Sequence, residues 1–446
     1  MDSSPELLAQ LDTEHHLHPF TDHRDLHAAG TQVMSRGHGV YVWDARGQRY
    51  LDGLAGLWCV NVGYGRDEIT DAVTAQMRRL PYYCSFFNTT TEPPIRLAAK
   101  IAELAPRGLG HVMFCNSGSE ANETALKLIR GYLKLRGQSH RTKILSRQFG
   151  YHGVTLATTS MTGLPSCTQP FDLPLPGFIH VPAPHAYAAQ READPGAYAT
   201  WCLEETGRII EREDPATIAA LFVEPVQGAG GVIVPPPGHL AGLRALARHH
   251  GILFVADEVI SGFGRLGAWF ASELWALEPD FMNLAKGLTS GYLPLGATVV
   301  RDEIAATLTE TGYLAHGYTY SGHPTSCAAA LANIEILERE QLPQRVRDEI
   351  GPYFQAKLRA LATHPRVGEV RGCGLIGALE LLPPDRDRAK LDTTLGARAA
   401  KIARSEGVII RGIRDLVAVA PPLIITRPEI DELCAGIERA LARLPE

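Results

Sequence analysis

Several features that would identify a class of function are missing from this chain of 446 residues. No run of 18 or more apolar residues occurs, so we expect no membrane-spanning helix. Residues 1–6 lack the basic and apolar segments of a secretory signal. The net charge of −6 is scattered along the chain rather than gathered into basic blocks. This distribution argues against a nucleic-acid surface and favours chemistry on small molecules.

Cysteine and histidine are present, but not in the spacings that bind metal. The eight cysteines include no C-x-x-C pair, which argues against a zinc site and against a disulfide framework. We expect free thiols in a reducing cytoplasm. Five histidines gather at positions 15, 16, 18, 23 and 27 without coherent ligand spacing. This part of the chain is therefore expected to be a surface arm, and no metal site is predicted.

Short apolar strands alternate with amphipathic helices from about residue 55 to residue 325. The alternation predicts an α/β fold with a mostly parallel sheet that binds ligands at the carboxyl ends of its strands. Strands are predicted at 112–116, 143–146, 219–224, 252–257, 281–285 and 297–300. An irregular arm (1–35) and a hairpin (40–52) precede this region; a long helix (326–340), further helices, and strands near 369–371, 375–381 and 408–411 follow it. We predict three segments: an arm with part of a small domain (1–54), a large domain (55–325) and the remainder of the small domain (326–446).

A lysine and an aspartate each end an apolar run in the central region. Lys286 follows the run 281–285, and Asp257 ends the run 252–257. Both runs are typical of buried strands. A partly desolvated lysine has a lowered pKa and becomes a usable amine nucleophile, while a carboxylate can hold a pyridinium nitrogen. The pair predicts pyridoxal phosphate (PLP) bound as a lysine Schiff base, with Asp257 on the ring nitrogen.

Other polar segments at strand ends and turns are open to two interpretations each. The small residues 117–119 precede a helix, and they can cradle a phosphate or simply cap that helix. Tyr151 can stack on a flat ring or lie in a surface turn. Glu224 ends a strand, either as a buried functional acid or as a surface carboxylate. Thr319 lies in a polar turn and can bind phosphate or only form part of the turn.

Taken together, these segments resemble one family. From about Gly39 to Thr426 the chain is similar to the class III PLP-dependent aminotransferases, in particular the ω-amino acid (β-alanine):pyruvate and amine:pyruvate transaminases. No single segment is specific, but the ordered set is. The set consists of LDGLAGLWC (51–59), NSGSEAN (116–122), YHG (151–153), VEPVQ (223–227), DEVISGFGR (257–265), LAKGL (284–288), YTYSGHP (318–324) and Arg411 with APP (420–422).

The resemblance implies fold type I, with a mostly parallel seven-stranded sheet in the large domain and a smaller α+β domain built from both termini. It implies that Lys286 carries the cofactor and moves a proton, and that Asp257 pairs with the ring nitrogen. The further cofactor contacts that it implies are Ser117, Gly118, Ser119, Tyr151, His152, Glu224, Val259 and Thr319. Thr319 is implied to reach the phosphate of the other subunit, which requires a homodimer; dimers can also pair into tetramers.

The residues of the substrate pocket have two interpretations. Trp58, Phe86 and Phe87 resemble the aromatic wall of amine-accepting members, and they can equally be core residues. Together with Tyr151, Arg411 resembles a substrate contact, because a guanidinium matches a carboxylate bidentately. Arg414 lies three residues further on and is the alternative carboxylate clamp.

The resemblance implies a transaminase that moves an amino group from an ω-amino acid or amine to a keto acid, with pyruvate as the expected acceptor, by a ping-pong mechanism. One alternative is a PLP-dependent decarboxylase or aminomutase, which would use the same lysine and aspartate. A remote alternative is a non-catalytic ligand-sensing module. The expected partners are small molecules and a second copy of the chain, without nucleic acid or membrane.

Overall fold

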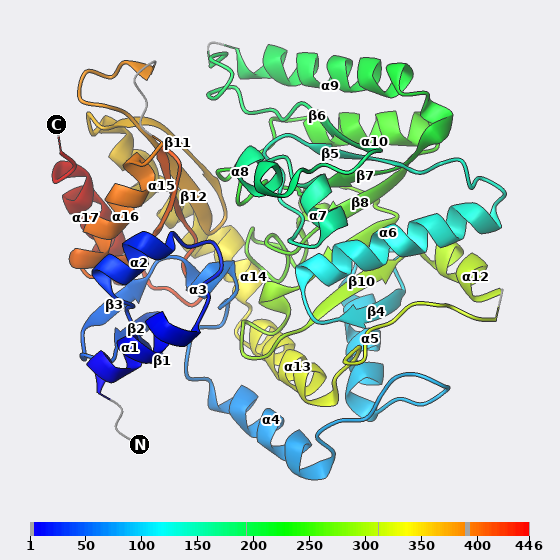
Figure 1. Cartoon of the computed structure of the whole chain (residues 1–446), viewed down its shortest axis with the longest axis horizontal. Coiled ribbons are helices and arrows are strands. Elements are labelled where there is room, and N and C mark those ends of the chain that lie inside the picture. Colours follow the sequence, from blue (N-terminus) through cyan, green and yellow to red (C-terminus); the bar gives the residue numbers. More distant parts are fainter. Residues whose placement is uncertain (1–3, 193, 311, 389–392, 446) are drawn as a thin grey trace.

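A seven-stranded sheet forms the centre of the computed structural model, which describes residues 4–192, 194–310, 312–388 and 393–445 (Figure 1). The strand order is β4-β10-β9-β8-β7-β5-β6. Only β10 runs antiparallel to its neighbours, so the predicted mostly parallel sheet is confirmed. The strands are β4 (His111–Cys115), β5 (Lys143–Arg147), β6 (Phe178–Val181), β7 (Ile218–Val223), β8 (Leu253–Asp257), β9 (Phe281–Leu284) and β10 (Gly296–Val300).

Helices cover both faces of this sheet, as the alternation of strands and helices predicts. On one face α6 (Gly118–Leu135), α7 (Leu156–Met161) and α12 (Asp302–Glu310) bury an apolar cluster that includes Phe222 and Val255. On the other face α9 (Pro195–Arg212) and α10 (His239–His249) pack against Leu221 and Phe254. Adjacent strand residues thus face opposite layers, since side chains alternate along a strand. Apolar clusters cover both faces of the sheet, so we expect the polar groups that a ligand can reach to lie at the ends of the strands.

Two four-stranded sheets lie beside the large sheet (Figure 1). One has the order β1-β2-β3-β13, and the parallel pair β3–β13 joins the two ends of the chain through Leu51 and Val408. The other has the order β11-β12-β15-β14. We retain the division at residues 54 and 325 as a proposal. The strands are β1 (Met34–His38), β2 (Tyr41–Asp44), β3 (Arg49–Asp52), β11 (Val367–Cys373), β12 (Ile376–Leu381), β13 (Val408–Ile409), β14 (Arg411–Ile413) and β15 (Leu416–Val419).

The remaining helices connect or cover these sheets. The long helix α13 (Pro324–Arg339) begins two residues earlier than predicted, with Pro324 at its first turn. The others are α3 (Ala55–Trp58), α4 (Asp67–Arg79), α5 (Glu92–Leu104), α8 (Pro165–Thr168), α11 (Ala271–Leu274), α14 (Leu342–Arg345), α15 (Gly351–Ala360), α16 (Leu395–Ser405) and α17 (Arg427–Ala442).

The prediction of an irregular arm over residues 1–35 is wrong. This segment forms α1 (Pro5–His15) and α2 (His23–Ala29) before β1 begins. Ser4 and Asp22 cap the two helices, each accepting a hydrogen bond from a backbone N–H two or three residues on. Neither helix buries a residue, which is why the apolar pattern gave no signal. The strand predicted at 408–411 is also wrong as one unit, because its residues divide between two sheets.

The N-terminal histidines are grouped more closely than their spacing suggested. The Asp12 carboxylate lies 2.9 Å from His16 Nδ1 and 2.7 Å from His18 Nε2, and it also accepts a hydrogen bond from the Thr31 hydroxyl. Asp12, His16 and His18 could hold a metal ion by distance alone. These hydrogen bonds already satisfy the carboxylate without an ion.

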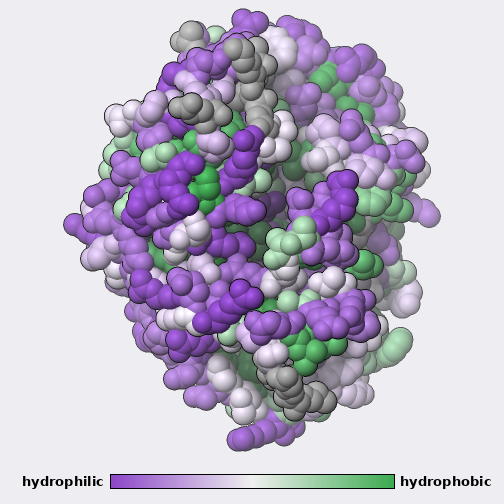
Figure 2. Space-filling model, turned by 60° about the vertical axis from the view of Figure 1, so that its left-hand side comes forward, coloured by the Kyte–Doolittle hydropathy of each residue, from purple (hydrophilic) through white to green (hydrophobic). Residues whose placement is uncertain are grey.

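The exterior is mostly polar. On the face drawn in Figure 2, hydrophilic residues predominate and hydrophobic ones are scattered between them, as expected for a surface in water. Among the described residues, none of the helices has the length and apolar character needed to cross a membrane.

Candidate active site

A cavity of about 120 Å³ lies where β5, β7, β8 and β9 end and α6 begins. Parallel strands present their carboxyl ends at one edge of the sheet, so residues from distant segments converge there. Eight of the predicted site residues line the cavity: Gly118, Ser119, Tyr151, His152, Glu224, Asp257, Val259 and Lys286. Asn122, Gly153 and Ile260 complete the lining and were not predicted.

Lys286 follows β9 and extends its amine into this cavity. Its backbone has φ 43°, a left-handed conformation that is unfavourable for a residue with a side chain. Burial lowers the pKa of the ammonium, because the charged form loses water; the Asp257 carboxylate opposes this shift. The result is an amine that deprotonates more readily than an exposed lysine, as a nucleophile or proton carrier requires.

Asp257 is held by two side chains from other segments. Asn122 Nδ2 and His152 Nδ1 both lie 2.8 Å from Oδ2. A carboxylate only accepts, so we assign the His152 proton to Nδ1. Oδ1 accepts one weaker bond, from the Val259 N–H at 3.2 Å. Of the two oxygens, Oδ1 therefore has the greater remaining capacity to accept a hydrogen bond from a ligand in the cavity.

Glu224 is a buried acid, as one of its two sequence interpretations requires. Its Oε1 accepts from the Tyr151 N–H at 2.8 Å, and its Oε2 accepts from the Gly228 N–H at 3.0 Å. Burial raises the pKa of this carboxyl, while the nearby His152 lowers it. The Arg147 guanidinium, also buried, donates to the Glu224 backbone oxygen. Glu224 thus fixes the backbone that carries Tyr151 over the cavity.

The start of α6 forms another part of the cavity lining. Ser117 Oγ caps the helix by accepting from the Glu120 N–H, and Ser117 itself does not line the cavity. The N–H groups of Gly118 and Ser119 have no partner within the helix and lie at its positive end. A Cβ at Gly153 would come within 2.6 Å of Ser119 Oγ, so the backbone approaches the helix closely only because glycine is there.

The donors and acceptors of this cavity fit a PLP molecule. An amine with a lowered pKa, a carboxylate with a free acceptor position and a helix N-terminus match the aldehyde, ring nitrogen and phosphate of that cofactor. Tyr151 and Val259 line the space between them, where the flat ring would be held.

Three predicted residues lie apart from this cavity, two of them in a second and larger hollow. Phe86 and Phe87 line a groove of about 970 Å³ that also involves Tyr313 and Gly317. Phe87 is 87% exposed, although core packing was its alternative interpretation. Thr319 is exposed nearby, and its backbone oxygen accepts from the Tyr82 hydroxyl at 2.6 Å. The structure of one chain therefore does not bring Thr319 to the cavity.

Trp58 and the two arginines have distinct surroundings. Trp58 is 2% exposed within an apolar cluster, and its indole N–H has no partner among the described residues. Arg411 is half-buried on β14 and close enough to Tyr151 and Lys286 to influence the pKa of both. Arg414 is exposed, donates to the Gly230 oxygen at 3.3 Å and lies over the Phe149 ring. The geometry thus places Arg411, rather than Arg414, near the cavity residues.

Comparisons with known proteins agree with this chemistry. The family described as Aminotransferase class-III matches residues 25–441. The putrescine–pyruvate aminotransferase of Pseudomonas aeruginosa is 44% identical over 432 residues, covering 97% of this chain and 95% of its own. A thermostable (S)-enantioselective ω-transaminase from Thermomicrobium roseum is 43% identical with TM-score 0.96, covering 100% of each chain. The ω-transaminase of Pseudomonas jessenii, solved in complex with PMP, is 38% identical with TM-score 0.93, covering 98% of this chain and 97% of its own.

Proposed function

The chain belongs to the class III aminotransferases, and we propose that this PLP-dependent enzyme takes its amino group from a primary amine or ω-amino acid and gives it to pyruvate. Transfer of an amino group from an amine to a keto acid is the activity of the family. The finer choice of substrates is supported by a relative that acts on putrescine and pyruvate and by structural neighbours that are ω-transaminases. We therefore prefer transamination to the three alternatives raised by the sequence: a decarboxylase, an aminomutase and a ligand-sensing module.

One observation carries the assignment of roles: Lys286, Asp257 and the start of α6 face the same small cavity. PLP, when bound, supplies an electron sink that stabilises negative charge at the substrate carbon. Asp257 Oδ1 would hold the ring nitrogen in its protonated form, while Asn122 and His152 keep the carboxylate in place. Gly118 and Ser119 would hold the phosphate with their N–H groups.

Lys286 Nζ has two tasks in this proposal. It would bind the cofactor covalently in the resting enzyme and, once released, would move a proton from the substrate carbon as a general base. Its lowered pKa serves both tasks, since each requires the neutral amine. Tyr151 and Val259 orient the ring, which decides the bond that is broken at the substrate carbon.

Recognition of the acceptor is assigned to Arg411. Its guanidinium has no hydrogen-bond or ion-pair partner within the described ranges, so it can bind a keto-acid carboxylate bidentately. Trp58 supplies an apolar wall through its ring, and its unpartnered indole N–H distinguishes it from an ordinary core residue.

A homodimer explains the residues that lie apart from the cavity. Phe87 and Tyr313, 87% and 80% exposed, line a groove suited to an apolar partner surface. A second copy seated there would bring its Thr319 to this chain's phosphate site and place Phe86 and Phe87 beside a substrate pocket. The eight unpaired cysteines fit a reducing cytoplasm.

The test is a half-reaction followed by absorbance. The purified enzyme is mixed with putrescine, β-alanine or 1-phenylethylamine without acceptor, and loss of the lysine-bound cofactor band reports amino transfer. Pyruvate or 2-oxoglutarate is then added. Recovery of the band with pyruvate, faster than with 2-oxoglutarate, is expected. No response to any of the three donors would contradict the proposed donor class, and preference for 2-oxoglutarate would contradict the acceptor.

A further inference from the structure

The turn that carries Lys286 is strained and begins directly after β9 ends. Within six residues the chain takes left-handed conformations at Lys286, Ser290 and Gly291, with φ of 43°, 50° and 75°. Only glycine adopts this region without cost, so the first two must be held by their surroundings. The internal bonds of the turn are uneven: the Leu288 N–H donates to the Ala285 oxygen at 2.9 Å, but the Thr289 N–H reaches the Lys286 oxygen only at 3.3 Å and the Ser290 N–H reaches the Gly287 oxygen only at 3.4 Å.

A single side chain from another element holds this turn. Asn333, on α13 and fully buried, donates from Nδ2 to the Gly287 oxygen at 2.9 Å and to the Leu288 oxygen at 3.0 Å. Its Oδ1 accepts from the Ser290 hydroxyl at 2.6 Å. The Ser290 hydroxyl oxygen in turn accepts from the Val62 N–H at 3.2 Å. Asn333 thus bonds both peptide oxygens that directly follow Lys286 and also the next strained residue.

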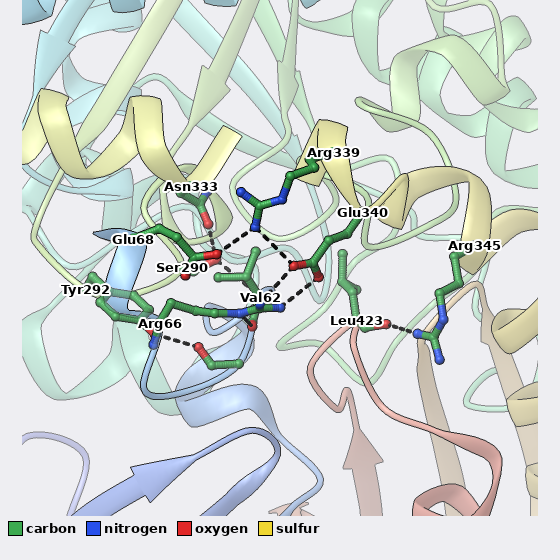
Figure 3. Close-up of polar contacts among 11 residues, drawn as sticks. Val62, Arg66, Glu68, Ser290, Tyr292, Asn333, Arg339, Glu340, Arg345 and Leu423 are labelled. Carbon is green, nitrogen blue, oxygen red and sulfur yellow. Dashed lines mark hydrogen bonds and ion pairs between the residues drawn. The ribbon is translucent and has the colours of Figure 1, made fainter. Parts of the chain in front are cut away.

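The helix that carries Asn333 is itself fixed at its end (Figure 3). Glu340, directly after α13, pairs with Arg66 through two bonds of 2.8 Å. Arg339 pairs with Glu68 at 2.6 Å. Because these ion pairs join α13 to the start of α4, Asn333 is held from a rigid support. The side-chain amide of Asn333 can therefore hold the turn in one position instead of moving with it.

We propose that Asn333 is a positioning residue that sets where Lys286 Nζ lies in the cavity, acting through the backbone of residues 287–290. The proposal rests on the role assigned to Lys286 in the proposed function. Nδ2 is the essential atom, since it provides two of the three bonds. Without it, the Leu288 oxygen loses the donor that Asn333 supplies and the Gly287 oxygen keeps only the 3.4 Å contact from the Ser290 N–H. The strained turn then relaxes, which moves the Lys286 amine from its place in the cavity.

The test compares two cofactor forms that differ only in their need for the lysine. PLP attaches covalently to Lys286, whereas pyridoxamine phosphate binds the same cavity without that bond. The variants are Asn333→Ala and Asn333→Asp, which puts an acceptor where the two carbonyls need a donor. Ser290→Ala removes the third bond together with the bond from the Val62 N–H, and it leaves both Nδ2 bonds in place. Ile336→Val, at a fully buried position on the same helix, is the control for lost packing.

The expected result is that Asn333→Ala slows covalent PLP attachment at least tenfold and leaves pyridoxamine phosphate affinity within threefold. Asn333→Asp should slow attachment more, Ser290→Ala less, and Ile336→Val should lower the Tm without slowing it. Two results would each overturn the proposal. One is that Asn333→Ala lowers the PLP attachment rate and the pyridoxamine phosphate affinity by the same factor; the other is that Asn333→Ala and Ile336→Val attach PLP at the same rate. Borohydride trapping of the wild-type enzyme followed by peptide mass spectrometry separates the two hypotheses: absence of label on Lys286 refutes the proposed function itself.

Discussion

The cofactor cavity and the Phe86–Phe87 groove differ in how completely one chain builds them. In the cavity, one oxygen of each acid is bonded to groups from distant segments of the same chain: Asp257 Oδ2 to Asn122 and His152, and Glu224 Oε1 to the Tyr151 N–H. In the groove, Phe87 is 87% exposed, and Thr319 is exposed nearby, outside the groove lining. The difference supports the proposal that one chain builds the chemical centre, while a second copy completes the phosphate and substrate side.

The largest effect is expected inside the cavity. Lys286→Ala removes both the cofactor attachment and the general base, so kcat should fall by about 10³–10⁴-fold. The fold should persist, because burying a lysine amine contributes no favourable packing that alanine must replace. Turnover with a good amine donor and size-exclusion chromatography measure the two outcomes. Lys401→Ala, at an exposed position on α16, is the control. Normal turnover in Lys286→Ala would remove the basis of the site assignment.

Asp257→Asn is expected to have the next largest effect. The amide keeps the shape of the side chain but not its charge, so the ring nitrogen is no longer held protonated. We expect kcat to fall by roughly 10²–10³-fold with little change in Tm. Asp71→Asn, exposed on α4, serves as the control. A drop no larger than that of the control would assign the ring nitrogen to a different residue.

Thr319→Ala tests the groove side of the comparison. If the hydroxyl of a second copy binds the phosphate, its loss should weaken PLP affinity roughly 10- to 100-fold, because a hydrogen bond to a charged group contributes about 1.5–3 kcal/mol. Release of PLP on dilution gives the affinity, and Thr70→Ala, exposed on α4, is the matched control. Unchanged PLP affinity together with a monomeric wild type would show that the cavity alone holds the cofactor.

Arg411 and Arg414 offer a matched pair, because they lie three residues apart and, of the two, Arg411 is the one near Tyr151 and Lys286. Arg411→Ala should raise the KM for pyruvate about tenfold or more, since it removes a bidentate charged contact, and should affect simple amines less. Arg414→Ala should leave both values nearly unchanged, because its guanidinium is engaged with Gly230 and Phe149. Steady-state kinetics with both substrates would reject the assignment if the two variants exchanged roles.

The position of a residue, at the end of a strand or on a helix, explains whether its role could be predicted from sequence. Lys286, Asp257 and Glu224 lie at the ends of apolar strands, a local signal that survives without knowledge of the fold. Asn122 and Asn333 lie on helices and act on groups 135 and 45–46 positions away, so no spacing marks them. Strand β6 was missed because its four residues include His180 and are flanked by prolines.

The smallest expected effect is a shift in the pH dependence of covalent PLP attachment to the apoenzyme. Attachment requires the neutral Lys286 amine, so its rate should rise about tenfold per pH unit and level off at the pKa of that amine, below the ordinary 10.5. Burial lowers this pKa, Asp257 raises it and Arg411 lowers it. The inflection should therefore move to lower pH in Asp257→Asn and to higher pH in Arg411→Ala. It should stay in place in Thr319→Ala, which changes no charge.

The lowered pKa of Lys286 also determines how the stability of the apoenzyme responds to pH. Between the lowered pKa and 10.5 the unfolded chain binds more protons at Lys286 than the folded chain, so this residue makes the free energy of unfolding of the apoenzyme increase with pH. Below that window the full penalty of burying a charged amine applies. Lys286→Ala should remove this contribution, which urea unfolding of both apoproteins across the window can measure. Two results together would contradict this expectation: an inflection of the attachment rate at or above the ordinary pKa of 10.5, and the same pH dependence of urea unfolding in the wild-type and Lys286→Ala apoproteins. They would mean that Lys286 is solvated like a surface lysine and that the cavity does not lower its pKa.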